Sequence, residues 1–434
     1  MRFLIITYYY SPNDSPRAIR WSAVAEQLIK KGHEVVIVCD RGGSFKSKEA
    51  RNGVQVYRTG TGVTNIVKRV KSSLEPKKEE DKNLEVTIRS SNLKDRLGFT
   101  INFLNRKVWH NFCWPDAECI WFPSARRMVF SLIRRNEYDG IISVSHPFSD
   151  HLVGFAIKRL RPGLRWLVDL GDPFSYVEQN ATNNQWLYRR LNYMAEQRIF
   201  HRAEAITVTT PETQRKYVDL FPGANGKIHV IPPVISWDGD LSKGPAPIQE
   251  DNRIVLVYAG TLYRNIRGPD FLLRLCVGLF KTKLGARLEL HIFGNISDVE
   301  ECFKSYPAFL GKKIFIHGLV SHDVARQAIQ EANILVNIGN ETSYQLPSKV
   351  VEYASTGKPV LNLAGNKDDT SAAFFRAYPA ALCLVQGEET LSQQVERLKS
   401  FIQAPPRIPR HKLLEWIKPY TLDAVTEAYL DLLR

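Results

Sequence analysis

Short apolar runs alternate with helix-length segments along most of this chain, and the alternation occurs twice over. Strands that alternate with helices are typical of parallel sheets built from βα units. We therefore predict an α/β protein with two parallel-sheet domains. The expected strands of the first half are 3–7, 34–39, 54–58, 140–145, 165–169, 205–209 and 228–231. Those of the second half are 254–258, 288–293, 314–317, 334–338, 360–363 and 381–385.

The length of the chain supports the same division. At 434 residues it exceeds what one hydrophobic core usually supports. The stretch SWDGDLSKGPAPIQEDN, residues 236–252, is rich in Pro, Gly and acidic residues and predicts a linker. We expect domains over 1–237 and 253–415, a linker over 238–252, and a C-terminal helix over 416–434 that can cross back to the first domain.

Composition indicates a soluble globular protein of a reducing compartment. Hydrophobic residues make up 44% and charged residues 24% of the chain, which is ordinary for such proteins. No run approaches the roughly 18 to 20 apolar residues that a membrane-spanning helix needs. The six cysteines are scattered without a C-x-x-C pair, so we expect reduced thiols and a cytoplasmic protein.

The net charge of +14 is distributed unevenly. Residues 1–237 contain 36 Lys and Arg against 23 Asp and Glu, a net charge of +13, and the remaining residues contribute +1. A one-sided positive field implies an anionic partner, such as nucleic acid, an acidic membrane surface or a phosphorylated substrate. No recognised nucleic-acid-binding motif accompanies the charge, so we do not expect a nucleic-acid partner.

The segment LPSKVVEYASTGKPVL, residues 346–361, predicts a short helix between two strands. Pro347 suits the first helical turn, Gly357 the position just past the helix, and Pro359 prevents its continuation. The helix start then lies at the carboxyl edge of a parallel sheet, where such folds bind ligands and where backbone N–H groups favour an anion. Lys349 supplies a phosphate-binding charge, and Glu352 can accept hydrogen bonds from both hydroxyls of a ribose.

A second nucleotide-binding element follows the strand at 254–258. In AGTLYRNIRG, residues 259–268, Gly260 permits close backbone approach, and Arg264 with Arg267 can grip a diphosphate. Taken alone, the segment fits an ordinary strand–turn–helix with surface arginines better than a nucleotide site. Two such elements in neighbouring βα turns of one domain favour a nucleotide site.

These motifs resemble a known family. In order, AGTLYRNIRG, HIFGN, FIHGLVSHDV and LPSKVVEYASTGKPVL are similar to the donor domain of retaining GT-B glycosyltransferases of the family 4 type. The start ITYYYSPNDSPRAIRW followed by LIKKGHEVVIV resembles their acceptor-binding domain. The resemblance implies an α/β GT-B fold, with two Rossmann-like parallel-sheet domains facing a central cleft. It also implies a nucleotide diphosphate sugar as co-substrate, with no cofactor and no metal.

The resemblance assigns roles in the C-terminal domain residue by residue. Glu352 matches the second acid of the E-x7-E motif, which holds the ribose. The expected donor nucleotide and diphosphate contacts are Gly260, Thr261, Arg264, Arg267, Ser348, Lys349 and Glu352. Tyr344 replaces the first acid of the motif, which contacts the transferred sugar, so Tyr344 and Gln345 are expected near the sugar. Arg267 stands where a Lys usually grips the diphosphate, and it is also an expected catalytic residue.

The resemblance assigns further roles in the N-terminal domain. His146, after the strand at 140–145, matches the family's active-site histidine loop. Asp172, in DLGDPF, stands in a segment similar to DFRDPW with Gly171 in place of Arg, and it can orient a sugar hydroxyl or His146 or cap the following turn. Arg17 and Arg20 either face the diphosphate across the cleft or form a solvated first helical turn.

An insertion at about 61–121 is too long for a normal loop. Its apolar residues from Leu97 to Phe112 fall on one helical face with basic residues among them. This pattern fits a core-packing helix with a solvated basic face, or an amphipathic segment in a membrane interface.

We therefore expect a retaining hexosyltransferase that moves a sugar to a glycan or lipid-diphosphate-linked acceptor in surface polysaccharide assembly. It would act at the inner face of the cell membrane, in peripheral contact with anionic lipid. A nucleotide-sugar epimerase of the same fold and a catalytically degenerate GT-B scaffold are the alternatives. Asp238 and Asp240 are interpreted as a turn, and Asp369 as a helix cap, not as metal ligands.

Overall fold

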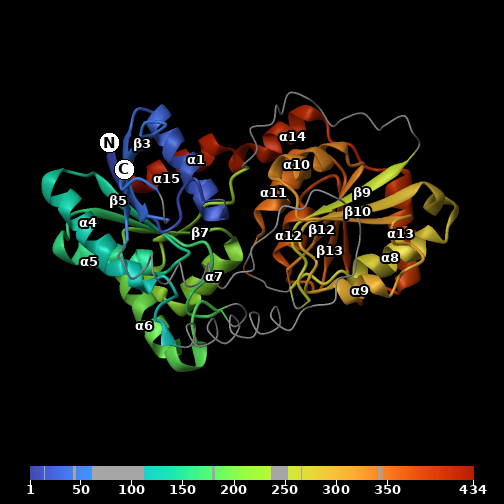
Figure 1. Ribbon diagram of the computed structural model, residues 1–434, viewed down its shortest axis with the longest axis horizontal. Coiled ribbons are helices and arrows are strands. Elements are labelled where there is room, and N and C mark those ends of the chain that lie inside the picture. The colour runs from blue at the N-terminus through green and yellow to red at the C-terminus, as the bar shows by residue number, and fades with distance from the viewer. Residues whose placement is uncertain are drawn as a thin grey trace. The chain divides into compact units, whose positions relative to one another are not determined.

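The computed structural model describes residues 1–13, 15–42, 45–60, 112–177, 181–235, 253–264, 266–340, 344 and 346–434. The chain divides into two compact units, one of residues 1–231 with 426–434 and one of residues 232–425. Most of the expected insertion (61–111), the expected linker with Asp238 and Asp240, and Gln345 lie outside the described residues. Each unit is built on one sheet (Figure 1).

The sheet of the first unit has eight strands in the order β3-β4-β2-β1-β5-β6-β7-β8. All neighbouring strands are parallel except the antiparallel pair β3 and β4. β3 was not predicted, because its sequence Lys-Glu-Ala-Arg has no apolar alternation. The strands are β1 (Arg2–Ile6), β2 (Glu34–Asp40), β3 (Lys48–Arg51), β4 (Val54–Thr59), β5 (Gly140–Val144), β6 (Arg165–Asp169), β7 (Ala205–Val208) and β8 (Ile228–Val230).

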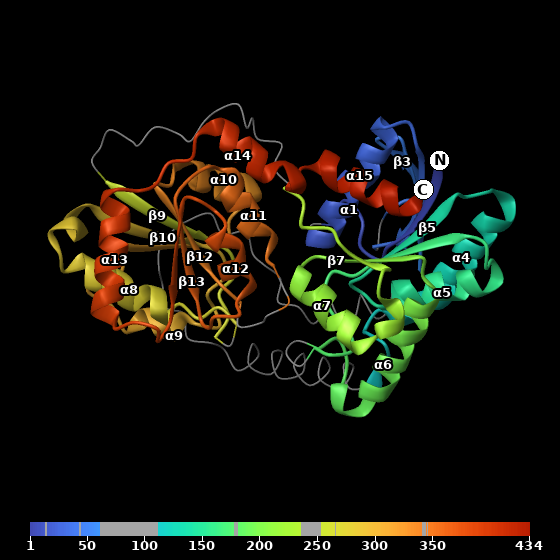
Figure 2. The ribbon, with the colours of Figure 1, turned by 180° about the vertical axis from the view of Figure 1, so that it is seen from behind.

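Helices cover both faces of this sheet. The apolar residues of one face pack against α4 (Phe122–Arg135), α5 (Ser149–Leu160), α6 (Gln185–Arg202) and α7 (Pro211–Leu220). On the other face, α1 (Pro16–Lys30) lies beside α15 (Leu422–Leu433), whose residues from Thr426 belong to this unit (Figures 1 and 2). The rings of Trp21 and Tyr429 are 4.9 Å apart there. Single turns of 3₁₀ helix lie at Cys119–Trp121 and Pro222–Ala224.

The sheet of the second unit has six parallel strands in the order β11-β10-β9-β12-β13-β14. Each of these strands begins and ends within one residue of its predicted bounds, because apolar residues predominate in each of them. They are β9 (Ile254–Ala259), β10 (Leu288–Phe293), β11 (Ile314–Gly318), β12 (Ile334–Ile338), β13 (Val360–Ala364) and β14 (Ala381–Val385).

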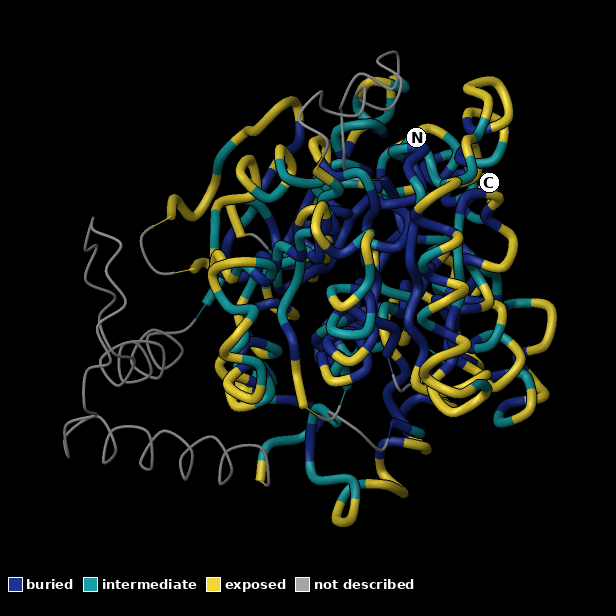
Figure 3. Tube along the Cα trace, turned by 90° about the vertical axis from the view of Figure 1, so that its right-hand side faces the viewer, coloured by how far each residue is buried: buried dark blue, intermediate teal, exposed yellow. Residues whose placement is uncertain are grey.

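One face of this second sheet packs against α8 (Asp270–Phe280), α9 (Glu300–Lys304) and α13 (Leu391–Gln403). The other face packs against α10 (His322–Glu331), α11 (Ser348–Ser355), α12 (Thr370–Arg376) and α14 (Arg410–Ile417). Further 3₁₀ turns lie at Lys283–Arg287 and Lys418–Tyr420. The strands of both units run through the buried interior, and the exposed turns of the helices surround them (Figure 3).

Helix starts follow the local signals in the sequence. Ser15 caps α1 by accepting a hydrogen bond from the N–H of Ala18, and Pro16 is the first helical residue. Asp369 accepts from the N–H of Ala372, which confirms it as the cap of α12. Within the described ranges, none of the helices combines the length and the apolar character that crossing a bilayer requires.

Candidate functional site

Two predicted nucleotide-binding segments of the second unit follow neighbouring strands. Residues 259–268 follow β9, and α11 follows β12, which pairs with β9 in parallel. Gly260 has a φ of +149°, a conformation that residues with a side chain rarely adopt. Its N–H donates to the carbonyl of Phe293, and a Cβ atom at Gly294 would lie 2.2 Å from the carbonyl oxygen of Gly260. The segment is therefore held close against the end of β10.

Lys349 points its ammonium group toward this segment. Its Nζ atom is 4.2 Å from the centroid of the Tyr258 ring and would be 3.1 Å from a Cβ atom at Gly260. The Nζ atom is buried and has no hydrogen-bond partner among the described residues. Burial, and then the positive charge of Arg267, hold the pKa of Lys349 well below its usual value, against the opposing charge of Glu352. An anion placed beside Nζ would supply the missing partner.

Arg267 lies at the same edge. Its Nε donates to the side-chain oxygen of buried Asn340, which follows β12. Burial raises the pKa of Tyr258 to about 12, although the neighbouring Arg267 acts in the opposite direction. The Tyr258 hydroxyl in turn donates to the carbonyl of Thr261, 3.2 Å away. Tyr258 therefore connects Lys349, Arg267 and the backbone of the 259–268 segment.

The other predicted residues of this unit have less specific surroundings. Arg264 is fixed through its backbone, whose N–H donates to Asp298 Oδ2 at 2.8 Å. Ser348 is exposed at the start of α11, and Glu352 is half-buried one turn after it. Tyr344 is half-buried between β12 and α11. Pro347 is the residue before the helix and not part of its first turn.

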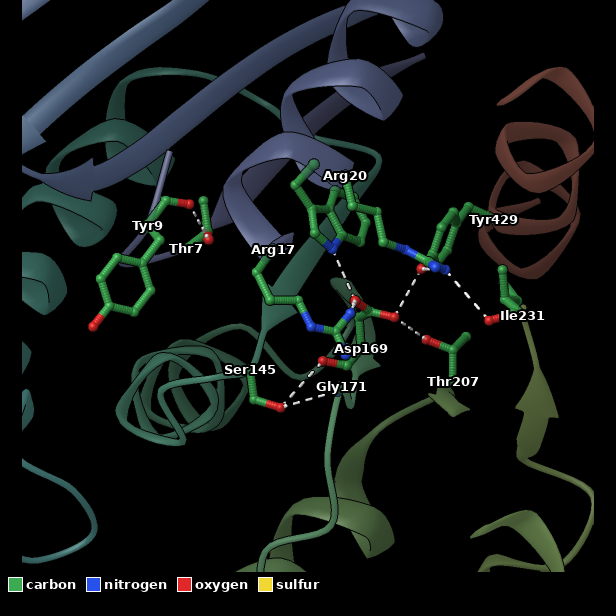
Figure 4. A network of polar contacts seen from close by, with 11 residues as sticks. Thr7, Tyr9, Arg17, Arg20, Ser145, Asp169, Gly171, Thr207, Ile231 and Tyr429 are labelled. Carbon is green, nitrogen blue, oxygen red and sulfur yellow. Dashed lines mark hydrogen bonds and ion pairs between the residues drawn. The ribbon is translucent and has the colours of Figure 1, made fainter. Parts of the chain in front are cut away.

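In the first unit, the centre of the polar contacts is Asp169, the last residue of β6 (Figure 4). Its buried carboxylate accepts hydrogen bonds from Trp21 Nε1 at 2.8 Å, Thr207 at 2.7 Å and Tyr429 at 2.8 Å. Burial alone would raise its pKa, but the guanidinium groups of Arg17 and Arg20 and these hydrogen bonds lower it. Asp169 is therefore ionised, and both of its carboxylate oxygens accept hydrogen bonds. Sequence inspection did not indicate this role.

Both arginines predicted at the start of α1 are engaged by this centre. Arg17 forms an ion pair with Asp169 at 3.2 Å. Arg20 is buried, and it donates to the Tyr429 hydroxyl at 2.8 Å and to the carbonyl of Ile231 (Figure 4). The expectation that Arg20 either faces a diphosphate or is solvated is therefore wrong, because its guanidinium group is buried and hydrogen-bonded inside the first unit.

His146 and Asp172 follow β5 and β6, which are neighbouring strands. Their two loops are joined by the stacked rings of Phe148 and Phe174, 3.7 Å apart. Ser145 completes the junction, because its N–H donates to the carbonyl of Asp169 at 2.9 Å. His146 is half-buried and Asp172 is exposed, so both lie at the rim of the joined loops.

Asp116 is a buried acid at the start of α5 that the sequence analysis missed. It accepts hydrogen bonds from the N–H and the hydroxyl of Ser149, at 2.8 and 2.7 Å, at the start of α5. Burial and the charge of Glu118 raise its pKa to about 6, against the effects of Ser149 and His146. Asp116 lies within the expected insertion, where no motif distinguished it from other acids.

Comparisons with known proteins agree with this arrangement. Residues 18–233 match the model of the glycosyl transferase 4-like domain. No curated protein matches the chain significantly. Among solved structures, the chain is similar over its whole length to sucrose-phosphate synthase from Thermosynechococcus elongatus, with 14% identity, a TM-score of 0.61 and 98% of that chain covered.

Two further structures match the whole chain. A glycosyltransferase from Rickettsia africae is 13% identical with a TM-score of 0.56, and 97% of it is covered. WaaG, a glycosyltransferase involved in lipopolysaccharide biosynthesis, is 12% identical with a TM-score of 0.54, and 99% of it is covered. The two Rossmann-like units are thus those of the GT-B fold. Within that fold, the chain belongs to the glycosyltransferases of the family 4 type.

Proposed function

We propose that this protein transfers a hexosyl group, with retention of configuration, from a nucleotide diphosphate sugar to a glycan or lipid-diphosphate-linked acceptor. The product would contribute to a surface polysaccharide such as capsule, lipopolysaccharide or exopolysaccharide. Membership of the family supports a nucleotide-sugar donor and an acceptor. The similarity to WaaG is consistent with the pathway.

The observation that carries the proposal is the buried Nζ atom of Lys349, which has no hydrogen-bond partner within the part of the chain that the structure describes. A buried ammonium without a hydrogen-bond partner is costly unless a ligand completes it. The guanidinium of Arg267 is near enough to lower the pKa of Lys349, and the backbone at Gly260 approaches Nζ without a side chain between them. Two cationic groups beside an open backbone segment suit the diphosphate of the donor.

The same groups account for the chemistry. As the glycosidic bond breaks, negative charge develops on the departing nucleoside diphosphate, and Lys349, Arg264 and Arg267 stabilise it. In a front-face displacement, this diphosphate also helps to remove the proton of the acceptor hydroxyl. Glu352 binds the ribose hydroxyls, while Ser348, Thr261 and the N-terminus of α11 contact the phosphates. Tyr344 faces the transferred sugar.

The first unit receives the acceptor in this proposal. His146 and Asp172 orient the reacting hydroxyl or the donor sugar from the joined loops after β5 and β6. Arg17 supplies a fixed positive charge there, since Asp169 holds its guanidinium. The net charge of +13 over residues 1–237 favours peripheral contact with the anionic inner face of the cell membrane.

Nucleotide binding tests the proposed donor site directly. Thermal unfolding is measured with UDP, GDP, dTDP and the corresponding sugars, for the wild-type protein and for Glu352→Ala. A ligand at 100 times its dissociation constant adds roughly 2.7 kcal/mol to the stability of the folded state. We expect one nucleotide family to raise the melting temperature of the wild type only. If no nucleotide has an effect, the donor site is refuted and a scaffold role is favoured.

A further inference from the structure

Helix α6 of the first unit exposes large apolar side chains to solvent. Trp186 is 90% exposed, Leu187 50% and Met194 42%. Leu191 and Tyr193 are also exposed on the same helix. Soluble proteins rarely expose several large apolar side chains together without a binding role. Figure 1 shows α6 as the green helix at the lower end of the first unit.

The charged residues on this exposed side are all basic. Arg189, Arg190, Arg198 and Arg202 are exposed, and within the described part of the chain none of them forms an ion pair with an acidic side chain. The one acidic residue of α6, Glu196, is fully buried. The exposed face therefore combines Trp and aliphatic side chains with an uncompensated positive charge.

The opposite side fixes the helix to the unit. Asn192, Ala195, Glu196, Ile199 and Phe200 are buried. Glu196 accepts a hydrogen bond from Tyr217 Oη at 2.5 Å, and Asn192 exchanges two hydrogen bonds with Asn183. The exposed face is thus presented by a helix of 18 residues, about 27 Å long, that cannot turn to bury its apolar residues.

A depression of about 640 Å³ adjoins the C-terminal half of α6. Its lining combines Arg159, Arg198 and Arg202 with the aromatic rings of Phe155, Tyr193 and Phe221. The guanidinium of Arg202 lies over the Phe155 ring at 5.7 Å. Arginines held above aromatic rings suit a phosphate group that carries an apolar body.

We propose that the exposed face of α6 docks on an anionic phospholipid membrane, an inference that rests on the peripheral membrane contact in the proposed function. Trp186, Leu187 and Met194 enter the boundary between headgroups and acyl chains. Arg189 and Arg190 contact the headgroup phosphates, and one headgroup occupies the depression beside Arg198 and Arg202. Tryptophan with Arg on a surface helix is the composition of helices that lie in a membrane interface.

Charge complementarity selects this partner. A second copy of the chain would bring the same arginines against one another, because a two-fold interface pairs a surface with itself. An anionic bilayer accepts both the arginines and the apolar side chains. The face therefore has the chemistry of a lipid contact and not that of a self-association contact.

Vesicle sedimentation of the full chain tests the inference. Neutral phosphatidylcholine vesicles are compared with vesicles that contain phosphatidylglycerol. One variant replaces Trp186, Leu187 and Met194 by Ser, and a second replaces Arg189 and Arg190 by Gln. The matched control replaces exposed Leu414 by Ser and exposed Arg410 by Gln on α14 of the second unit. Each basic residue at an anionic surface strengthens partitioning about fivefold.

We expect the wild type and the control to bind anionic vesicles, and both α6 variants to bind at least roughly tenfold more weakly. Lipids brominated near the headgroup should quench the tryptophan fluorescence of the wild type more than that of Trp186→Phe. If the α6 variants bind anionic vesicles as strongly as the wild type does, the role of α6 is overturned, although the protein still contacts membranes. If the wild type does not bind anionic vesicles, both the role of α6 and the peripheral membrane contact are overturned.

Two further readouts separate other causes. The nucleotide-dependent melting shift should be unchanged in the α6 variants, so its absence from the wild type would refute the donor site and not the lipid contact. Light scattering in the absence of lipid reports self-association. A dimer that dissociates when the three apolar residues are replaced would overturn the lipid assignment.

Discussion

The guanidinium group of Arg17 occupies the space that a side chain at residue 171 would need. A Cβ atom at Gly171 would lie 1.7 Å from Nη2 of Arg17. The same guanidinium is paired with Asp169, two residues earlier in the chain. Gly171 and Arg17 are therefore a matched pair, in which the small residue makes room for a charge supplied by α1.

We expect Gly171→Ala to destabilise the first unit by about 1–3 kcal/mol, because the methyl group must displace Arg17 from its buried partner. Urea unfolding measures the change. Gly163→Ala is the control, since a Cβ atom there has no neighbour within 4 Å. Arg17→Met removes the same ion pair, so the double variant should cost less than the sum of the single variants. Strict additivity would contradict the matched pair.

Arg267→Ala should lower kcat on the order of 10²-fold, because a charge that stabilises the departing diphosphate is lost. Donor hydrolysis or transfer is measured once the nucleotide is known. Arg274→Ala is the control, since Arg274 is exposed on α8 of the same unit. Near-normal turnover of Arg267→Ala, or an equal loss in both variants, would show that Arg267 does not stabilise the departing diphosphate.

Nucleotide binding should be coupled to proton uptake by Lys349. Burial holds the pKa of this ammonium well below its usual value in the ligand-free protein, and a bound diphosphate would raise it. Affinity should therefore fall as pH rises above the ligand-free pKa, by up to about tenfold per pH unit. Calorimetry in buffers of different ionisation enthalpy counts the protons. Lys349→Arg should abolish the uptake, because Arg stays protonated. Equal uptake in both proteins would assign the proton to another group.

Glu196 should make stability depend on pH. Burial raises its pKa from 4.5 to about 7, so the folded state holds a proton that the unfolded state releases. Its contribution is therefore fully present below pH 4.5 and is lost as pH rises through 7, a change of roughly 3 kcal/mol. The stability advantage of the wild type over Glu196→Gln should shrink across this window. A difference that stays constant with pH would show that Glu196 is ionised throughout, and Glu137→Gln serves as an exposed control.

Regular periodicity made the fold predictable. Strands such as β9 are continuous apolar runs between turn signals, and such runs predict buried parallel strands directly. β3 gave no such signal, because an edge strand needs no apolar residue. Sequence alone did not decide whether the C-terminal helix returns to the first domain, because no local pattern identifies the partner of Tyr429.

The candidate site was predictable only where residues adjacent in sequence act together. Lys349 and Glu352 share one helix, so their spacing alone indicated a phosphate and a ribose contact. The ion pair between Arg17 and Asp169 joins residues 152 positions apart, and no periodicity reports such a contact. Asp116 was missed for the same reason, because its partners lie on α5.

The hydrogen bond from Tyr429 to Asp169 bears on how the protein is made. Residues 1–231 hold all eight strands of the first sheet. The carboxylate of Asp169, at the end of β6, nevertheless accepts one of its hydrogen bonds from Tyr429, near the end of the chain. During synthesis the first unit must therefore wait, with Asp169 incompletely coordinated, until the whole second unit has been translated. Domains usually fold in the order in which they emerge. Here the unit that begins first is completed last.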